Sequence, residues 1–210
     1  MLKRAFDIIF SFIGIILLFP IFIIVGIIIK IDSKGPIFFS QERIGKNFKA
    51  FKILKFRTMV YDNKGPLLTA RGDQRITRVG KYLRRYKIDE LPQLFNVFKG
   101  DMSLVGPRPE VRKYVELFKP YYKEILTLRP GITDPASLKY SDEESILSLS
   151  QDYEELYIRR ILPDKIKLSL EYIKNQNIIT DILIIFRTIL RIKNSKNLYE
   201  HHNNKKLSGN

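Results

Sequence analysis

The sequence predicts an α/β protein that is mostly helical, carries a few short strands, and begins with an apolar membrane helix. Residues 8–29 are apolar or small and include no charged side chain. Residues 37–56 alternate roughly between aromatic and basic side chains, as strands do, whereas later segments repeat apolar residues at helical spacing. We therefore divide the 210 residues into a membrane segment (1–34), one compact domain (35–193) and a polar tail expected to be disordered (194–210).

Charge and cysteine content limit the classes of partner and site. The chain has 37 Lys and Arg against 22 Asp and Glu, a formal charge of +15, which favours an anionic partner. Nucleic acid, anionic lipid head groups and phosphorylated substrates all qualify, so the sign alone does not choose among them. The absence of cysteine excludes disulfides and thiolate metal sites, and the only histidines, His201 and His202, are adjacent in the polar tail.

The apolar stretch is long enough to cross a hydrocarbon core of ~30 Å as a helix. Pro20 lies in its middle and removes a helical hydrogen bond, so we predict that it splits the helix into segments 7–19 and 21–30. Basic residues flank both ends, which favours a cytoplasmic location for both. Two interpretations stay open on these grounds: a hairpin that enters and leaves one leaflet, and a kinked helix that spans the bilayer once. No small-x-small cleavage site follows, so we expect the segment to be retained.

Residues 35–60 are predicted to be extended and to carry a phosphate clamp. Gly35 and Pro36 signal a turn, and the aromatic and basic residues that follow alternate as in a strand. Lys55 and Arg57 are two positions apart, so both side chains leave the same face of a strand and can hold one phosphate. The alternative is a basic strand face in contact with solvent.

Two acidic residues precede a short predicted helix. The apolar residues at helical spacing are Leu91, Leu94, Phe95 and Phe98, and the end is marked by Gly100. Asp89 and Glu90 therefore stand at a helix N-terminus, where backbone N–H groups and the helix dipole favour anions. An ionised acid beside a phosphate site is a candidate nucleophile, and the alternative is that Asp89 is only an N-cap.

Two arginines are presented by proline-containing loops. Pro107 and Pro109 lock the backbone on either side of Arg108, whose planar fork suits a diphosphate. Arg129 stands directly before Pro130 and repeats the Arg-Pro pair of this loop. Taken alone, each motif is also compatible with a stiff loop whose arginine is solvated.

The last predicted helices carry a second signal for the membrane. Residues 143–174 read as helical, and residues 178–192 form an amphipathic helix with basic residues on one side. Such a helix can lie in the head-group plane with its apolar face in the lipid, or it can pack on the core. Both interpretations stay open.

The run from Asp89 to Pro109 resembles, almost letter for letter, the signature of bacterial sugar transferases that are monotopic polyprenyl-phosphate phosphoglycosyl transferases of the small type. The resemblance extends over about residues 2–190 and includes the Lys-Phe-Arg-Thr-Met and Arg-Pro-Gly-Ile-Thr motifs already described in part. It implies a re-entrant helix that is broken at Pro20 inside one leaflet, and interfacial helices beside it. Residues 134–144 depart from the commoner family pattern, so contacts to the sugar cannot be carried over to them.

The resemblance also implies a displacement at phosphorus in two steps. Asp89 attacks a nucleoside diphosphate sugar, by analogy a uridine one, and a polyprenyl (undecaprenyl) phosphate then takes the sugar phosphate from the aspartyl intermediate. Attack by a carboxylate on an anionic diphosphate requires charge masking, so we expect Mg²⁺ held by Glu90 and phosphate oxygens. The side chains expected to bind phosphate are Lys55, Arg57, Arg84, Arg108 and Arg129.

These implications place the protein in the bacterial inner (cytoplasmic) membrane, with its active site on the cytoplasmic face, at the first membrane step of glycan biosynthesis. The expected partners are a nucleotide-sugar donor, a polyprenyl phosphate and one membrane leaflet; nucleic acid is not expected, and a homodimer stays open. Two alternatives remain. A membrane-tethered nucleic-acid-binding protein predicts salt-sensitive binding to DNA or RNA, and a non-catalytic scaffold does not require both Asp89 and Glu90.

Overall fold

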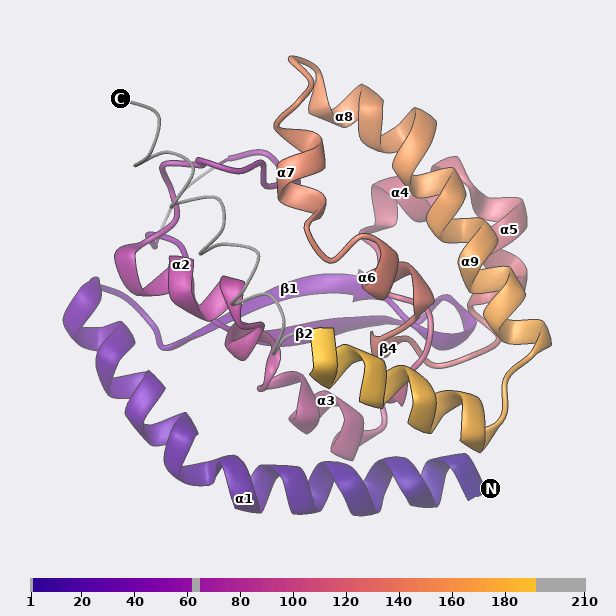
Figure 1. The fold of residues 1–210 in the computed structure, drawn as a ribbon, viewed down its shortest axis with the longest axis horizontal. Helices are drawn as coiled ribbons and strands as arrows, with labels where there is room; N and C mark the ends of the chain where they lie inside the picture. Colours follow the sequence, from indigo (N-terminus) through magenta and orange to yellow (C-terminus); the bar gives the residue numbers. More distant parts are fainter. Residues whose placement is uncertain (1, 62–64, 192–210) are drawn as a thin grey trace.

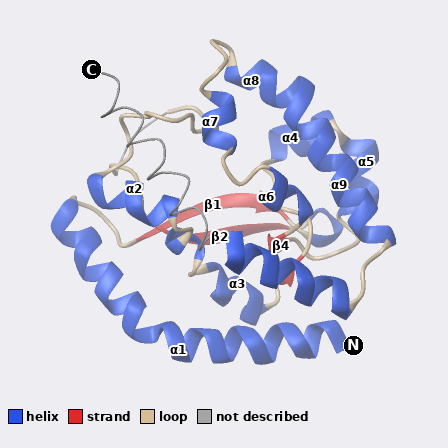
Figure 2. Ribbon diagram, in the orientation of Figure 1, coloured by secondary structure: helices blue, strands red, loops and turns tan. Residues whose placement is uncertain are grey.

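The computed structural model describes residues 2–61 and 65–191, and the predicted tail (194–210) lies outside them. The described chain is mostly helical, with short strands near its centre (Figure 1, Figure 2), which confirms the predicted α/β class. The labelled helices are α1 (Leu2–Asp32), α2 (Arg78–Arg85), α3 (Gln93–Lys99), α4 (Arg112–Leu117), α5 (Lys119–Ile125), α6 (Pro135–Lys139), α7 (Glu143–Leu147), α8 (Tyr153–Leu156) and α9 (Leu162–Lys174). A further helix covers residues 178–191, and the strands are β1 (Phe38–Ile44), β2 (Ala50–Phe56), β3 (Ser103–Val105) and β4 (Gly131–Thr133).

Helix α1 is one continuous helix that contains Pro20, and Figure 1 shows it bend near its middle and curve around one side of the domain. A proline removes a helical hydrogen bond and bends the helix without having to end it. The predicted bend is therefore present, but the two predicted segments stay joined as one helix. By length and composition α1 is able to cross a membrane, and only 17% of its most apolar 18-residue window is buried.

The N-terminal half of α1 is tied to β3 by polar contacts. Asp7 Oδ1 accepts hydrogen bonds from the Ser103 hydroxyl at 3.0 Å and from the Leu104 amide at 2.9 Å. Lys3 Nζ donates to the Val105 carbonyl at 2.9 Å. Asp7 is only 2% exposed, so the domain satisfies a carboxylate that sits in an otherwise apolar helix.

The C-terminal half of α1 is held by apolar packing instead. Phe22, Val25 and Ile29 lie on one side of the helix and are buried against Phe56 of β2 and Leu83 of α2. These α1 positions repeat at intervals of three and four residues, so a single stripe faces the domain. The outward side is a row of exposed isoleucine, leucine and phenylalanine side chains.

The strands form two small pairs. β1 and β2 are antiparallel, with Phe38 opposite Phe56, which confirms the extended structure predicted there. β3 and β4 are parallel, with Ser103 opposite Gly131. A Cβ atom on Gly131 would collide with the backbone of Gly106, and one on Gly106 would collide with the carbonyl oxygen of Arg129. The two proline-containing loops, which these residues adjoin, are therefore pressed together.

The main core lies between β1 and helices α4, α5, α7 and α9. Its buried side chains are Ile44, Val111, Tyr114, Val115, Tyr122, Ile125, Leu126, Leu147, Tyr157, Ile161, Leu162 and Ile166. The large apolar and aromatic groups in this cluster stabilise the domain by removing apolar surface from water. The core therefore anchors α7 through Leu147, and α6 packs against α9; both helices contribute to the site described below.

The helix over residues 178–191 packs on the domain with one side and exposes apolar groups on another. Asp181 is buried, forms an ion pair with Lys3 of α1, and accepts a hydrogen bond from the Tyr172 hydroxyl at 2.6 Å. The exposed apolar residues are Ile178, Ile179, Ile182, Leu183, Phe186, Ile189 and Leu190. The helix is therefore packed on the core, beside the first half of α1 (Figure 1), while its other apolar side has no protein partner within the described residues.

Candidate active site

Asp89 and Glu90 lie in a short 3-10 turn (Ile88–Glu90) between α2 and α3. Lys87, with a φ of 55°, redirects the chain at the end of α2, and α3 begins at Gln93 with Pro92 as its N-cap. The predicted helix therefore starts later than expected. No side chain caps α3, so the alternative that Asp89 serves only as its N-cap is wrong.

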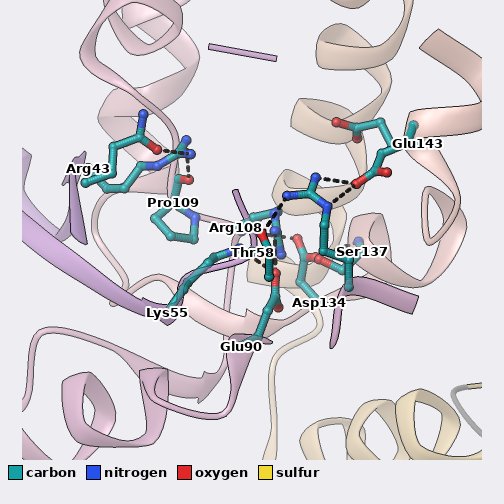
Figure 3. Close-up of polar contacts among 12 residues, drawn as sticks. Arg43, Lys55, Thr58, Glu90, Arg108, Pro109, Asp134, Ser137 and Glu143 are labelled. Atoms are coloured by element: carbon teal, nitrogen blue, oxygen red, sulfur yellow. Dashed lines mark hydrogen bonds and ion pairs between the residues drawn. The ribbon is translucent and has the colours of Figure 1, made fainter. Parts of the chain in front are cut away.

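Glu90 joins two of the predicted cations. Its Oε1 atom accepts a hydrogen bond from Lys55 Nζ at 2.7 Å and another from Arg108 NH2 at 2.8 Å. Figure 3 shows the three side chains converging from β2, the turn before α3, and the loop after β3. The fold thus brings together three of the residues that the sequence selected.

Asp89 and Glu90 are both buried, and their surroundings shift their pKa values in opposite directions. Burial raises the pKa of Asp89, although the charge of Lys55 opposes this effect and that of Glu90 adds to it. Burial also acts to raise the pKa of Glu90, but Arg108, Lys55 and Lys87 outweigh it and hold that pKa well below its usual value. Glu90 is therefore the stabilised anion, and Asp89 is the less compensated carboxylate.

Among the buried side-chain polar atoms of the described residues that lack a hydrogen-bond partner, one is a carboxylate oxygen, and it belongs to Asp89. Asp89 Oδ1 is buried and has no hydrogen-bond partner. Folded proteins rarely leave a buried polar atom unpaired, and a catalytic role or a bound ligand is one explanation for such an atom. A carboxylate oxygen without a partner, next to bound cations, is a suitable nucleophile toward phosphorus.

Arg108 is held in place from two directions. Its guanidinium binds Glu90, which raises the pKa of Arg108 further and keeps it charged. Its backbone N–H donates to Asp134 Oδ2 at 3.3 Å, and Pro107 and Pro109 on either side are buried. The predicted proline-braced arginine is thus present at the site and is not a solvated loop residue.

Arg84 of α2 is bound by α7. Its Nε atom donates to Glu144 Oε1 at 3.0 Å, its NH2 group reaches the same oxygen, and its NH1 group lies 3.4 Å from the Thr58 hydroxyl. The charge of Arg84 is close enough to lower the pKa of Asp89, against the larger opposing effect of burial. Arg84 therefore borders the site but does not contact Glu90.

Lys55 and Arg57 do not form the shared clamp that their spacing predicts. β2 ends at Phe56, so Arg57 no longer follows the strand alternation. Arg57 NH2 donates to the Ser33 carbonyl at 2.8 Å, and its NH1 donates to the Lys34 carbonyl. Arg57 is only 4% exposed and binds the chain just beyond the end of α1. Of the two residues, Lys55 is the one that contacts Glu90.

Arg129 is also engaged by a backbone carbonyl. Its Nε atom donates to the Gly100 carbonyl at 2.8 Å, at the C-terminal end of α3. Asp89 and Glu90 precede the other end of that helix. The structure therefore assembles Lys55, Glu90 and Arg108 beside Asp89, sets Arg84 at the margin, and places Arg57 and Arg129 at helix ends.

The acidic residues of the site fit only a metal ion with few protein ligands. No group of three or more His, Cys, Asp or Glu side chains arranged to hold a metal occurs within residues 2–61 and 65–191. Mg²⁺ often binds one or two carboxylates and completes its shell with water and substrate phosphate oxygens. The adjacent carboxylates of Asp89 and Glu90 match that preference.

Three residues at the site were not selected from the sequence: Thr58, Asp134 and Glu144. Asp134 is followed by Pro135 and caps α6, accepting from the Ser137 amide at 2.7 Å, and this helix-start pattern is readable in the sequence. Its contact with Arg108 is not, because the two residues are far apart in the chain. Glu144 likewise carries no local signal for its bond to Arg84.

Comparison with known proteins identifies the family. A family model described as bacterial sugar transferase matches residues 1–195. The UDP-N-acetylgalactosamine-undecaprenyl-phosphate N-acetylgalactosaminephosphotransferase of Aeromonas hydrophila is 40% identical over 196 residues, which are 91% of this chain but 43% of that protein. The chain thus spans less than half the length of this relative.

Two further relatives are covered more fully. The exopolysaccharide production protein PSS of Rhizobium leguminosarum bv. phaseoli is 41% identical over 90% of this chain and 94% of its own length. The UDP-glucose:undecaprenyl-phosphate glucose-1-phosphate transferase of Caulobacter vibrioides is 36% identical over 94% of this chain and 72% of its own length. With the family model covering nearly the whole chain, this protein belongs to the bacterial sugar transferase family.

Proposed function

We propose that this protein is a phosphoglycosyl transferase that moves a sugar 1-phosphate from a uridine diphosphate sugar to undecaprenyl phosphate. The names of the Aeromonas and Caulobacter relatives, which specify UDP-sugars and undecaprenyl phosphate, support the two substrates. The observation that carries the proposal is Asp89, a buried carboxylate with an unpaired oxygen beside a second carboxylate that two cations hold.

The first step forms a covalent intermediate. An Asp89 oxygen attacks the sugar-proximal phosphorus, the bond from that phosphorus to the bridging oxygen breaks, and uridine monophosphate leaves with the bond's electron pair. The sugar phosphate is then held on Asp89 as an acyl phosphate. The raised pKa of Asp89, caused by burial, favours this role because a more basic carboxylate is a stronger nucleophile.

The second step regenerates the enzyme. An oxygen of undecaprenyl phosphate attacks the same phosphorus, and the bond to Asp89 breaks, which releases the carboxylate and the polyprenyl diphosphate sugar. Both steps gather negative charge at one phosphorus. Lys55 and Arg108, fixed through Glu90, are the cations placed to offset that charge.

Glu90 and the donor phosphates are the proposed ligands of Mg²⁺. The ion, when bound, would supply further neutralisation of the diphosphate. Glu90 suits this role because its pKa is held well below the usual value by Arg108 and Lys55, which overcome burial, so it stays ionised. Its second contribution is structural, since it orients both cations.

The location follows from α1 and the lipid acceptor. An apolar helix at the N-terminus, and relatives whose names specify undecaprenyl phosphate, support a membrane protein. We further propose that α1 enters and leaves the cytoplasmic leaflet of the inner membrane, because basic residues flank both its ends. The site would then lie at the depth of the acceptor's phosphate.

Release of uridine monophosphate from a panel of UDP-sugars tests the proposal. The assay contains Mg²⁺ and undecaprenyl phosphate in detergent, and compares wild type with Asp89→Asn and with Asp101→Asn at the other end of α3. Wild type and Asp101→Asn should release the nucleotide from one or more donors, and Asp89→Asn should lose on the order of a thousandfold or more of the rate.

The intermediate has its own measurement. Without the lipid acceptor, intact-protein mass spectrometry of the wild type should show the added mass of one sugar phosphate, and Asp89→Asn should not acquire it. Undiminished release by Asp89→Asn would exclude Asp89 as the nucleophile. Absence of release from every donor would favour the scaffold alternative.

A further inference from the structure

Residues 134–144 depart from the commoner family pattern, and their two ends contact Arg108 and Arg84 at the site. Asp134, at the start of the segment, is 0% exposed and accepts from the backbone N–H of Arg108. Glu144, near its end, accepts from the guanidinium of Arg84. One segment therefore supplies a carboxylate to each arginine.

Three parts of the chain meet at the guanidinium of Arg84: α2, which carries Arg84, α7, and the residues just after β2. Glu144 of α7 takes the Nε and NH2 edge of the guanidinium, and the Thr58 hydroxyl, just after β2, lies 3.4 Å from NH1. The backbone of Glu144 is itself fixed, because its carbonyl accepts from the Arg71 amide at 3.0 Å. A side chain with this many rotatable bonds is thus confined to one orientation.

The contact leaves Arg84 able to bind a further anion. The NH1 bond to Thr58 is long for a hydrogen bond, so a phosphate oxygen can replace it without breaking the Glu144 contact. The Arg84 side chain is 23% exposed and that of Glu144 is 35% exposed, so the pair lies at an accessible margin. Pre-orienting an arginine reduces the entropy lost when it binds a phosphate.

We propose that Glu144 is a positioning residue, which holds Arg84 in the orientation that binds the donor diphosphate. The segment that departs from the family pattern thus provides two carboxylates, Asp134 and Glu144, that bind Arg108 and Arg84 respectively. This inference rests on the proposed function in one respect only, the identity of the diphosphate as a uridine nucleotide. Glu144 touches neither substrate nor Asp89 and acts through Arg84.

A double-mutant cycle on the binding of UDP tests this inference. The dissociation constant of UDP with Mg²⁺ is measured by calorimetry on the full chain in detergent, for wild type, Glu144→Ala, Arg84→Ala and the double variant. Glu144→Ala should weaken binding by roughly three- to fivefold, as expected for loss of a partly exposed ion pair. In the Arg84→Ala background the same change should have no further effect.

Two more variants separate positioning from general structure. Glu144→Gln keeps an acceptor oxygen and should fall between wild type and Glu144→Ala. Glu155→Gln removes a comparable exposed partner of Arg159 elsewhere and should leave the UDP affinity unchanged. Thermal unfolding of each variant checks that the fold is intact.

Three results would contradict a positioning role for Glu144. Tighter or unchanged binding by Glu144→Ala, an equal loss in both backgrounds, or a wild type that does not bind UDP would overturn it. Tighter binding would mean that Glu144 competes with the ligand for Arg84. A wild type that shows the predicted coupling but releases no uridine monophosphate from any UDP-sugar would overturn the proposed function alone.

Discussion

Asp89 and Glu90 are neighbours in the chain, yet the fold surrounds their carboxylates differently. Glu90 binds Lys55 and Arg108 directly, so the cost of its burial is more than offset and its pKa falls well below the usual value. The charges of Lys55, Lys87 and Arg84 act on Asp89, but burial outweighs them and raises its pKa, and its Oδ1 atom has no hydrogen-bond partner. Such divergence between adjacent acids is a mark of a site with two roles.

Asp89→Asn should make the folded protein more stable. A carboxyl whose pKa is raised in the folded state destabilises the fold at pH values where it is ionised, because the unfolded chain binds its proton less tightly. The amide removes this charge. At pH 7 we expect Tm to rise by roughly 2–4 °C, the change that about 1 kcal/mol causes in a chain of this size.

Glu90→Gln is the matched comparison in the same melting experiment. The lowered pKa of Glu90 stabilises the fold above the unfolded value of 4.5, and that contribution is lost as the pH falls through the folded value. Removing the charge should lower Tm at pH 7, because Lys55 and Arg108 lose their partner. A fall in Tm for Asp89→Asn would contradict the assignment of Asp89 as the uncompensated acid.

Lys55→Met should shift the acidic limb of the pH–rate profile upward. Burial raises the pKa of Asp89 above 3.8, and the charge of Lys55 counteracts part of that rise. Without Lys55 the nucleophile becomes protonated at a higher pH, so kcat/KM for nucleotide release should decline earlier on acidification. Lys52→Met, on the same strand but exposed, should leave the limb in place; an unmoved limb in Lys55→Met would contradict the prediction.

At the scale of the element, α1 combines two means of attachment. Its first half uses the carboxylate of Asp7 and the amine of Lys3, and its second half uses a buried apolar stripe. The bend at Pro20 lets both halves follow the curved side of the domain (Figure 1). The helix is therefore shaped to the domain along its whole length, which a straight spanning helix would not achieve.

Both ends of α1 should lie on the cytoplasmic side. The chain has no cysteine, so Leu2→Cys and Lys34→Cys each create a unique thiol at an exposed position. A maleimide that cannot cross membranes should label neither in intact spheroplasts and both after lysis. Leu149→Cys, exposed on the domain, reports the side on which the domain lies.

The labelling pattern separates the two topologies. If Leu2→Cys reacts in intact spheroplasts while Leu149→Cys does not, α1 spans the bilayer and the one-leaflet topology is wrong. Pro20→Leu offers a further comparison, because it should remove the bend in α1. A straighter helix should no longer place both its ends on the cytoplasmic side, and the packing of Phe22, Val25 and Ile29 should weaken.

Across the whole molecule, apolar groups without a protein partner among the described residues gather on α1 and on the helix over residues 178–191. The Lys3–Asp181 ion pair keeps these two helices side by side, although they stand at opposite ends of the described chain. Their exposed faces consist of isoleucine, leucine and phenylalanine. This arrangement suits a molecule that rests on lipid through two separate segments.

Replacing Ile179 and Phe186 together by serine should impair use of the lipid acceptor while sparing the soluble ligand. Both side chains are well exposed, so the domain should remain folded. Loss of their burial in lipid should lower kcat/KM for undecaprenyl phosphate roughly tenfold. The dissociation constant of UDP should not change, and Lys167→Ser on α9 is the control; an equal loss for both substrates would contradict a role in lipid contact.

The sequence by itself determined the membrane segment, the bend at Pro20, the α/β class and the acidic and arginine motifs. Composition, helical spacing and proline chemistry act over short stretches of chain, so they can be read without the fold. The convergence of Lys55 and Arg108 on Glu90 was expected only as a set of separate phosphate ligands. Their distances and the opposite pKa shifts of the two acids required the structure.

Only the tertiary structure decided the places of Arg57, Arg129, Asp134 and Glu144. Arg57 and Arg129 carry the same charge as Arg108, but the backbone carbonyls that bind them come from segments distant in sequence. Asp134 and Glu144 reach the site because α6 packs against α9 and α7 is anchored in the core through Leu147. Contacts between residues that are distant in the chain leave no local sequence pattern. They depend on how the elements pack, so only the tertiary structure could show them.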